Sequence, residues 1–178
     1  MKLKYLVLLL LFIPIKLSYT EELSVYHYGF QENSETYLFG DNVRVRKEPA
    51  VKNDNIADVL NSGVKVRILQ KTDQVMSVDG YKEYWDKISY KKNNKNSDGY
   101  VWGGLLSIGY SVNGGRLFLT GLKKYSQDSG FTAECRLVEN GKTLSSVSFS
   151  PHYINFGADD GFYGYSVSTE LKGSRGLD

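Results

Sequence analysis

The fold class is indicated most clearly by the run Asp41-Asn42-Val43-Arg44-Val45-Arg46-Lys47-Glu48-Pro49. Val43 and Val45 alternate with two arginines, and this period of two predicts a β-strand that turns its valines to one face. Pro49 ends the run because proline has no N–H to donate to a β-ladder. The whole chain has 18 glycines and 14 tyrosines but only 3 prolines. That composition is typical of a β-protein with many turns and half-buried aromatic residues.

Short alternating runs of the same kind follow, separated by turn signals such as Asp79-Gly80, and helical periodicity is almost absent. Apolar character resumes at residues 56–60, and we expect further strands at residues 64–68, 84–90 and 100–102. Residues 91–99, rich in Lys and Asn, read as a polar loop. A short barrel needs interior side chains that alternate along every strand. The residues expected to fill it are Val43, Val45, Leu60, Val66, Ile68, Ile88 and Val101.

Four sequence blocks of this region follow one another in order: Val43-x-Val45-Arg46-x-x-Pro49, Leu60-x-x-Gly63-x-x-Val66, Trp85-x-Lys87-Ile88 and Gly99-Tyr100-Val101-Trp102-x-x-x-Leu106. In order and spacing they resemble a bacterial SH3-like (SH3b) domain covering residues 37–110. The resemblance implies a small β-barrel and a role in binding the peptide stems or cross-bridges of peptidoglycan. Arg44, Glu48 and Tyr100 stand where Asn, Gly and Trp are common in the family. These departures concern the ligand groove and leave the expected fold in place.

Residues 1–20 have the order of a secretory signal peptide: two early lysines, an apolar run over residues 6–13, then Pro14 and small or polar residues. The run is far shorter than the ~20 residues of a membrane-spanning helix, which makes a signal anchor the less favoured alternative. We therefore expect an exported protein, periplasmic or at the cell surface, without a transmembrane segment after cleavage. Residues 21–36 are read as an N-terminal extension.

Cleavage after Thr20 would remove three lysines and no acidic residue, so 22 basic and 20 acidic residues become 19 and 20, and the net charge moves from +2 to −1. A balanced chain has no electrostatic footprint for nucleic acid. The single cysteine, Cys135, cannot form an internal disulfide, so stability must come from packed sheets.

Residues 116–178 are expected to be a β-rich C-terminal region, with Asn113-Gly114-Gly115 as a break before it. Residues 131–137 alternate strictly, with Phe131, Ala133, Cys135 and Leu137 on one face. A three-residue turn over 140–142 would set Cys135 opposite Val147 and Ala133 opposite Phe149, so that the apolar faces match. Residues 163–171 read as one more strand. Three or four strands are few for a separate domain. Two alternatives stay open: the region packs on the barrel, or it is an incomplete domain.

No set of residues suited to catalysis stands out. Cys135 with His152 is the one pair that suggests a thiol nucleophile and its base, but Cys135 lies in mid-strand on an apolar face, which favours a structural role. His27 and His152 lie in unrelated segments without further ligands at metal-like spacing, and Asp159-Asp160-Gly161 lacks the rest of a calcium loop. We expect no enzyme activity, no metal and no cofactor.

The aromatic residues of the barrel half are the candidate ligand-binding residues: Tyr81, Tyr84, Trp85, Tyr100 and Trp102. SH3 folds use such side chains to bind extended peptides. The leading hypothesis is a non-catalytic binding protein that docks peptidoglycan or a partner peptide in the cell envelope. Two alternatives are a structural protein-interaction module, in which the barrel supports a C-terminal sheet that contacts other proteins, and a regulatory or truncated part of an envelope hydrolase.

Overall fold

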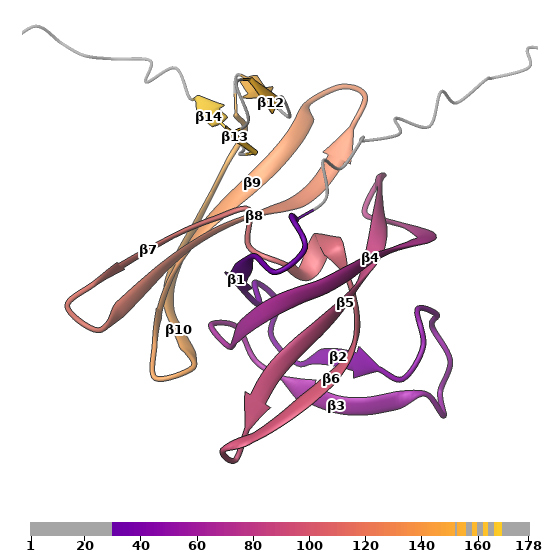
Figure 1. The fold of residues 1–178 in the computed structure, drawn as a ribbon. Helices are drawn as coiled ribbons and strands as arrows, with labels where there is room; N and C mark the ends of the chain where they lie inside the picture. Colours follow the sequence, from indigo (N-terminus) through magenta and orange to yellow (C-terminus); the bar gives the residue numbers. More distant parts are fainter. Residues whose placement is uncertain (1–29, 152, 156–157, 160–161, 164–165, 169–178) are drawn as a thin grey trace, which may run out of the picture.

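The computed structural model describes residues 30–151, 153–155, 158–159, 162–163 and 166–168. In this part of the chain the protein is nearly all β, with one short 3₁₀ turn, η1 (Gly103–Leu105). Two sheets account for most of it, a six-stranded sheet and a four-stranded sheet that lie against each other (Figure 1). No helix in the described residues is long and apolar enough to cross a bilayer.

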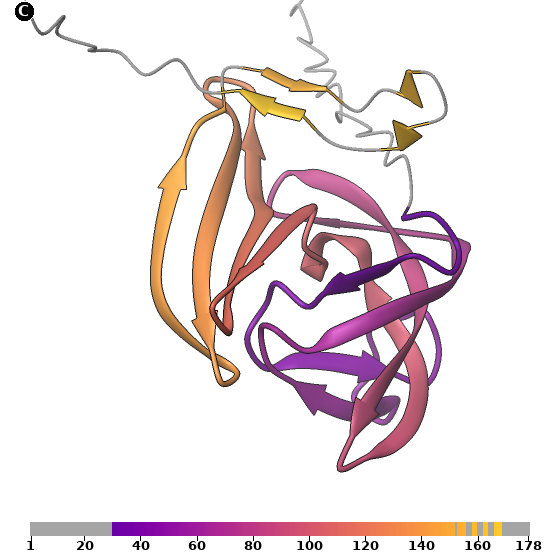
Figure 2. The same ribbon diagram turned by 60° about the vertical axis from the view of Figure 1, so that its left-hand side comes forward.

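The six-stranded sheet curls into a half-barrel, which confirms the all-β fold class (Figure 2). Its strand order is β1-β4-β5-β6-β2-β3, and every pairing is antiparallel. The strands are β1 (Glu35–Tyr37), β2 (Val43–Arg46), β3 (Ile56–Leu60), β4 (Lys65–Val78), β5 (Tyr81–Lys92) and β6 (Lys95–Trp102).

The half-barrel encloses the core that the sequence predicted. All seven expected interior residues are at most 6% exposed, and Leu38, Tyr90 and Leu106 join them in one cluster. Alternation explains the placement, because Val43 and Val45 face inward while Arg44 between them is exposed. Full burial of each aliphatic side chain stabilises the fold by about 1.5–3 kcal/mol.

The expected polar loop at residues 91–99 is wrong. β5 continues to Lys92, β6 begins at Lys95, and these two residues pair across a two-residue turn. Asn93 and Asn94 both adopt left-handed backbone angles, with φ of 50° and 62°. Asparagine tolerates that conformation, so the pair closes a tight hairpin without glycine. The turn expected at Asp79-Gly80 is confirmed, with φ of 51° and 87° between β4 and β5.

The four-stranded sheet has the order β10-β9-β8-β7. Its strands are β7 (Gly109–Asn113), β8 (Arg116–Ser126), β9 (Gly130–Glu139) and β10 (Lys142–Phe149). Asn113 pairs with Arg116, so Gly114-Gly115 is the turn between two strands of this sheet. Two short pairs follow, β11 (Tyr153–Asn155) with β14 (Ser166–Ser168) and β12 (Ala158–Asp159) with β13 (Phe162–Tyr163). The strand expected at residues 163–171 extends beyond the described residues.

The hairpin of β9 and β10 has the expected register. Cys135 lies opposite Val147, and Ala133 lies opposite Phe149. The route to this register differs from the expected three-residue turn. Glu139 pairs with Lys142 across the two-residue turn Asn140-Gly141, and a bulge after Thr143 then shifts the pairing by one residue. The bulge supplies the extra residue that the longer turn would have supplied.

The four-stranded sheet packs on the half-barrel through Phe39, which is 4% exposed and clusters with Leu119 and Val138. Gly121 lies directly under the Phe39 ring: a Cβ at residue 121 would stand 2.4 Å from the ring carbon Cδ1. The Arg136 guanidinium lies over the same ring, 4.4 Å from its centroid, and donates a hydrogen bond of 2.5 Å to the Phe39 carbonyl oxygen. Of the two alternatives for this region, the described part of it packs on the half-barrel.

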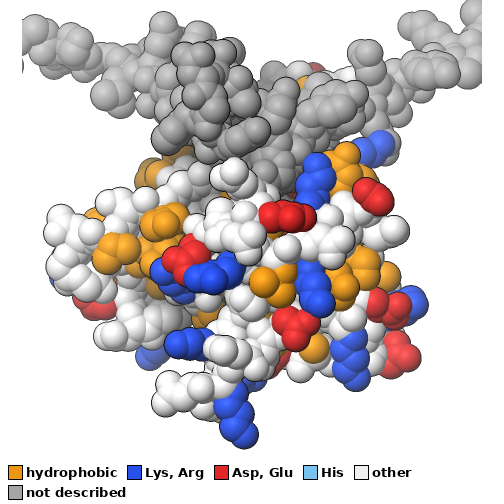
Figure 3. Space-filling view, viewed as in Figure 1, with side chains coloured by type: hydrophobic (Ala, Val, Ile, Leu, Met, Phe, Trp, Pro, Cys, Tyr) orange, Lys and Arg blue, Asp and Glu red, His pale blue; other side chains and the backbone are white. Residues whose placement is uncertain are grey.

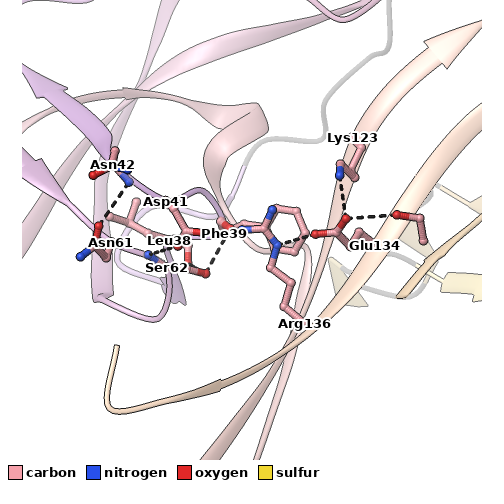
Figure 4. A network of polar contacts seen from close by, with 10 residues as sticks. Leu38, Phe39, Asp41, Asn42, Asn61, Ser62, Lys123, Glu134 and Arg136 are labelled. Atoms are coloured by element: carbon pink, nitrogen blue, oxygen red, sulfur yellow. Dashed lines mark hydrogen bonds and ion pairs between the residues drawn. The ribbon is translucent and has the colours of Figure 1, made fainter. Parts of the chain in front are cut away.

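A buried carboxylate completes this interface (Figure 4). Glu134 is 4% exposed and accepts hydrogen bonds from Lys123, Arg136 and Ser148 at 2.7, 2.5 and 3.1 Å. Burial opposes ionisation, but the hydrogen bonds from Lys123 and Arg136 outweigh it and hold the pKa of Glu134 below its usual value of 4.5. The sequence had placed Glu134 on the polar face of its strand. It is buried because that face of β9 packs on the half-barrel.

Candidate ligand-binding groove

The two tryptophans lie side by side on the outer face of the half-barrel. Trp85 in β5 is directly opposite Trp102 in β6, and directly opposed residues share a face. Val101, the neighbour of Trp102, is fully buried in the barrel core, so the tryptophan must point to the other side. Both indoles are 4% exposed.

The long hairpin of β4 and β5 holds one indole in place. Its pairing shifts register between Lys71 and Val75, which is the mark of a bulge that bends the hairpin. The Trp102 Nε1–H is shared between the carbonyl oxygens of Met76, at 3.0 Å, and Glu83, at 3.2 Å. Trp102 is therefore fixed by hydrogen bonds as well as by packing.

A groove of about 220 Å³ runs beside the tryptophans. Its lining is mainly apolar and comes from four strands, the loop after β2, the residues before β2, and η1. The lining residues are Asp41, Asn42, Val43, Arg44, Arg46, Val51, Met76, Trp85, Trp102 and Leu105. Pockets for drug-sized ligands have volumes of about 300–1,000 Å³, so this groove suits a short segment of a longer ligand.

Arg46 fixes the loop that carries Val51 to the groove. Its guanidinium donates to the Lys52 carbonyl oxygen at 2.7 Å and to Asn55 Oδ1 at 2.6 Å. The Asn55 amide in turn donates to the Ala50 carbonyl oxygen at 2.7 Å. These bonds hold Val51 at the groove while its side chain stays 62% exposed.

The five predicted ligand-binding residues are distributed over different places. Trp85 and Trp102 line the groove. Tyr100 lies on the same face as both indoles and is half-buried, with the Lys87 ammonium 6.0 Å from its ring centroid. Tyr84 directly precedes Trp85 and has the opposite side-chain direction; it is half-buried and carries the Lys71 ammonium over its ring, 4.1 Å from the centroid.

Tyr81 lies away from the groove, in the contact between the two sheets. It is 2% exposed, its ring centroid is 5.2 Å from that of Trp102 and 6.0 Å from that of Phe131, and its hydroxyl donates to the Leu122 carbonyl oxygen at 3.3 Å. Burial raises the pKa of the Tyr81 hydroxyl well above its usual value of 10. These contacts give Tyr81 a packing role.

Of the ten residues that line the groove, sequence reasoning named two as ligand-binding and missed eight, among them Arg44, Val51 and Met76. Arg44 had a visible signal, because its place between two inward valines sends it to the outer face. Val51 and Met76 had no such signal in the sequence. Val51 lies in a loop and Met76 in a bent hairpin, and only the tertiary structure brings them to the groove.

Neither a metal centre nor a thiol site takes shape in the described residues. No group of three or more His, Cys, Asp and Glu side chains gathers there. The half-buried Cys135 has its Sγ 3.3 Å from Thr120 Oγ1. His27, His152 and Asp160-Gly161 lie outside the described residues.

Two buried carboxylates lie near the groove, Asp86 at 0% and Glu83 at 3% exposure. Both approach Gly103 at the start of η1: a Cβ on that residue would stand 3.1 Å from Asp86 Oδ2 and 3.5 Å from Glu83 Oε2. Glycine is therefore the residue that leaves them room beside the tryptophans.

The groove can thus offer aliphatic surface and a charged rim to a ligand, beside two largely buried indoles. Models of protein families, curated proteins and solved structures were all compared with this chain, and none of them matches it.

Proposed function

We propose that this chain is an exported, non-catalytic binding protein of the cell envelope, periplasmic or at the cell surface, whose half-barrel docks a peptide of the cell wall. The observation that supports the proposal is the groove beside Trp85 and Trp102. Peptide-binding β-barrels bind extended chains along aromatic-lined grooves of this kind.

The groove is suited to a peptide on physical grounds. The two indoles are 4% exposed and form a fixed part of the groove wall, so a ligand that rests on the apolar surface around them orders few side chains. Trp102 is already held by its hydrogen bonds to Met76 and Glu83, so binding would not have to order it. The volume of about 220 Å³ fits a short peptide segment.

Retention on purified peptidoglycan sacculi tests the proposal. The variant Val51→Asp places a charge on the apolar wall of the groove without disturbing a buried residue, because Val51 is 62% exposed. The matched control is Val112→Asp, on an equally exposed valine (60%) of the four-stranded sheet. We expect wild type and Val112→Asp to be retained and Val51→Asp to be retained at least tenfold less. Equal retention of both variants, or no retention of wild type, would overturn the proposal.

A second candidate function is a protein-interaction module whose partner contacts the four-stranded sheet. One observation favours it: Phe118, Leu144 and Val147 on that sheet are 45%, 53% and 61% exposed. In Figure 3, apolar atoms also lie on the left of the view, over the four-stranded sheet, while acidic and basic side chains are interspersed on the visible face. Under this candidate Phe118→Asp would abolish capture of an envelope protein, and Val51→Asp would not.

A further inference from the structure

We infer that the ligand of the groove carries a carboxylate, and that Arg44 binds it beside a small apolar side chain that rests on Val51. This inference rests on the proposed function, because it specifies the ligand of the same groove.

Arg44 has no counter-ion in the part of the chain that the structure describes. Among the described residues its guanidinium forms no hydrogen bond, ion pair or ring contact. Its cross-strand neighbour on β3 is the uncharged Val59. Other basic side chains of the half-barrel do have carboxylate partners; these are Lys52, Lys65, Arg67, Lys87 and Lys92.

The remaining charges of the groove are engaged within the protein. The Arg46 guanidinium donates hydrogen bonds to the Lys52 carbonyl oxygen and to Asn55 Oδ1. Asp41 lies 3.5 Å from the Arg136 guanidinium, across the contact between the sheets, and accepts a hydrogen bond from the Ser62 N–H at 3.3 Å. The nearest carboxylate on β3, Asp58, is held by Lys92 and Tyr90. Arg44 is therefore the groove charge left for a ligand.

The chemistry of arginine selects the ligand group. A guanidinium presents a planar fork of N–H donors that matches the two oxygens of a carboxylate. Val51 lies on the same groove and exposes its side chain, so the part of the ligand next to the carboxylate meets aliphatic surface. The charge and the apolar wall together describe a peptide with a free carboxylate adjoining a small apolar residue.

Two tripeptides serve as probes: acetyl-Ala-Ala-Ala with a free terminal carboxylate, and the same peptide as its carboxamide. Binding to the full chain is measured by titration, followed by the NMR signals of the two indole N–H groups. We expect the acid to bind about tenfold more tightly than the amide, since a hydrogen bond to a charged group strengthens binding by roughly this factor. Raising the salt concentration should narrow the difference.

Variants at the rim of the groove test whether Arg44 causes the difference in affinity between acid and amide. Arg44→Gln should bind acid and amide equally, and Arg44→Lys should keep part of the difference because lysine retains the charge but lacks the fork. The control Lys47→Gln removes an exposed positive charge from the residue that follows β2 and lies outside the groove lining, and it should leave the difference unchanged.

Each other outcome has a definite meaning. Equal binding of acid and amide by the wild type, with Val51→Asp weakening both, overturns the inference and leaves the proposed function standing. If Arg44→Gln still prefers the acid, another residue binds the carboxylate of the peptide, and the inference is overturned. Absence of binding by either tripeptide overturns the inference as well, and the retention of wild type on sacculi then decides separately whether the proposed function falls with it.

Discussion

Gly121→Ala tests the contact between the two sheets most sharply. The added methyl group would stand 2.4, 2.5 and 2.7 Å from three carbons of the Phe39 ring, whereas carbon atoms prefer separations of about 3.5–4.0 Å. The ring would have to move by about 1 Å, but it is 4% exposed and covered by the Arg136 guanidinium. Overpacking of this kind costs about 1–3 kcal/mol.

The backbone effect of the same substitution has the opposite sign. Alanine stabilises the interior of a strand by about 0.5–1 kcal/mol relative to glycine. We therefore expect Gly121→Ala to lower the free energy of unfolding by about 1–2 kcal/mol. With an m-value of about 2 kcal/mol per molar urea, in the middle of the usual range, the unfolding midpoint should fall by roughly 0.5–1 M.

The assay is urea unfolding followed by tryptophan fluorescence, with Gly109→Ala as the matched control. The nearest atom to a Cβ at residue 109 is 3.9 Å away, so this variant should be neutral or slightly stabilised. In a Phe39→Leu background the cost of Gly121→Ala should shrink, because the ring that it meets is gone. If Gly121→Ala stabilises the protein as much as Gly109→Ala does, Phe39 does not lie on Gly121 and the described packing is refuted.

Three further predictions concern single side chains. Glu134→Gln should lower the free energy of unfolding by about 3 kcal/mol at pH 7, the lower end of the range for a broken buried ion pair. Because the pKa of Glu134 is lowered in the folded state, the stabilisation by its carboxylate is present above pH ~4.5 and is lost as the pH falls through the folded pKa. In urea unfolding at several pH values, the variant should therefore lose less stability on acidification than wild type does. Trp102→Phe removes a buried hydrogen-bond donor and leaves two carbonyl oxygens without it, so the same assay should show a loss of about 1–3 kcal/mol. Cys135→Ser should change stability by less than about 1 kcal/mol and leave retention on sacculi unchanged, since the polar contact of the half-buried thiol in the described part of the chain is with the Thr120 hydroxyl; loss of retention would point to a functional thiol.

The core of the half-barrel could be predicted from the sequence because alternation fixes the direction of each side chain. Val43, Val66 and Ile88 are all buried as expected, and the register of the hairpin that contains Cys135 and Val147 followed from matching its apolar faces. Both inferences use only local periodicity and the burial of one face.

The parts that depend on packing between sheets could not be predicted in this way. The same alternation that placed the valines assigned Glu134 to solvent, because the sequence does not show that a second surface covers the polar face. Tyr81 and Trp102 look alike as aromatic residues of neighbouring strands, and both belong to one buried cluster with Leu122 and Ala133 of the four-stranded sheet, yet of the two only Trp102 also lines the groove. The bulge after Thr143 could not be predicted either. A two-residue turn with a bulge and a three-residue turn without one give the same register, so matching the apolar faces does not distinguish them.

Binding of a ligand in the groove beside the tryptophans can be followed directly, because the chain carries its own reporter. The protein has two tryptophans, and both line this groove. Titration of the ¹⁵N-labelled protein with soluble peptides released from peptidoglycan should shift both indole N–H signals along one saturable curve, and Val51→Asp should weaken that curve while Val112→Asp leaves it unchanged. Indole signals that stay fixed at millimolar peptide, while wild type is still retained on sacculi, would show that the cell wall is bound outside this groove.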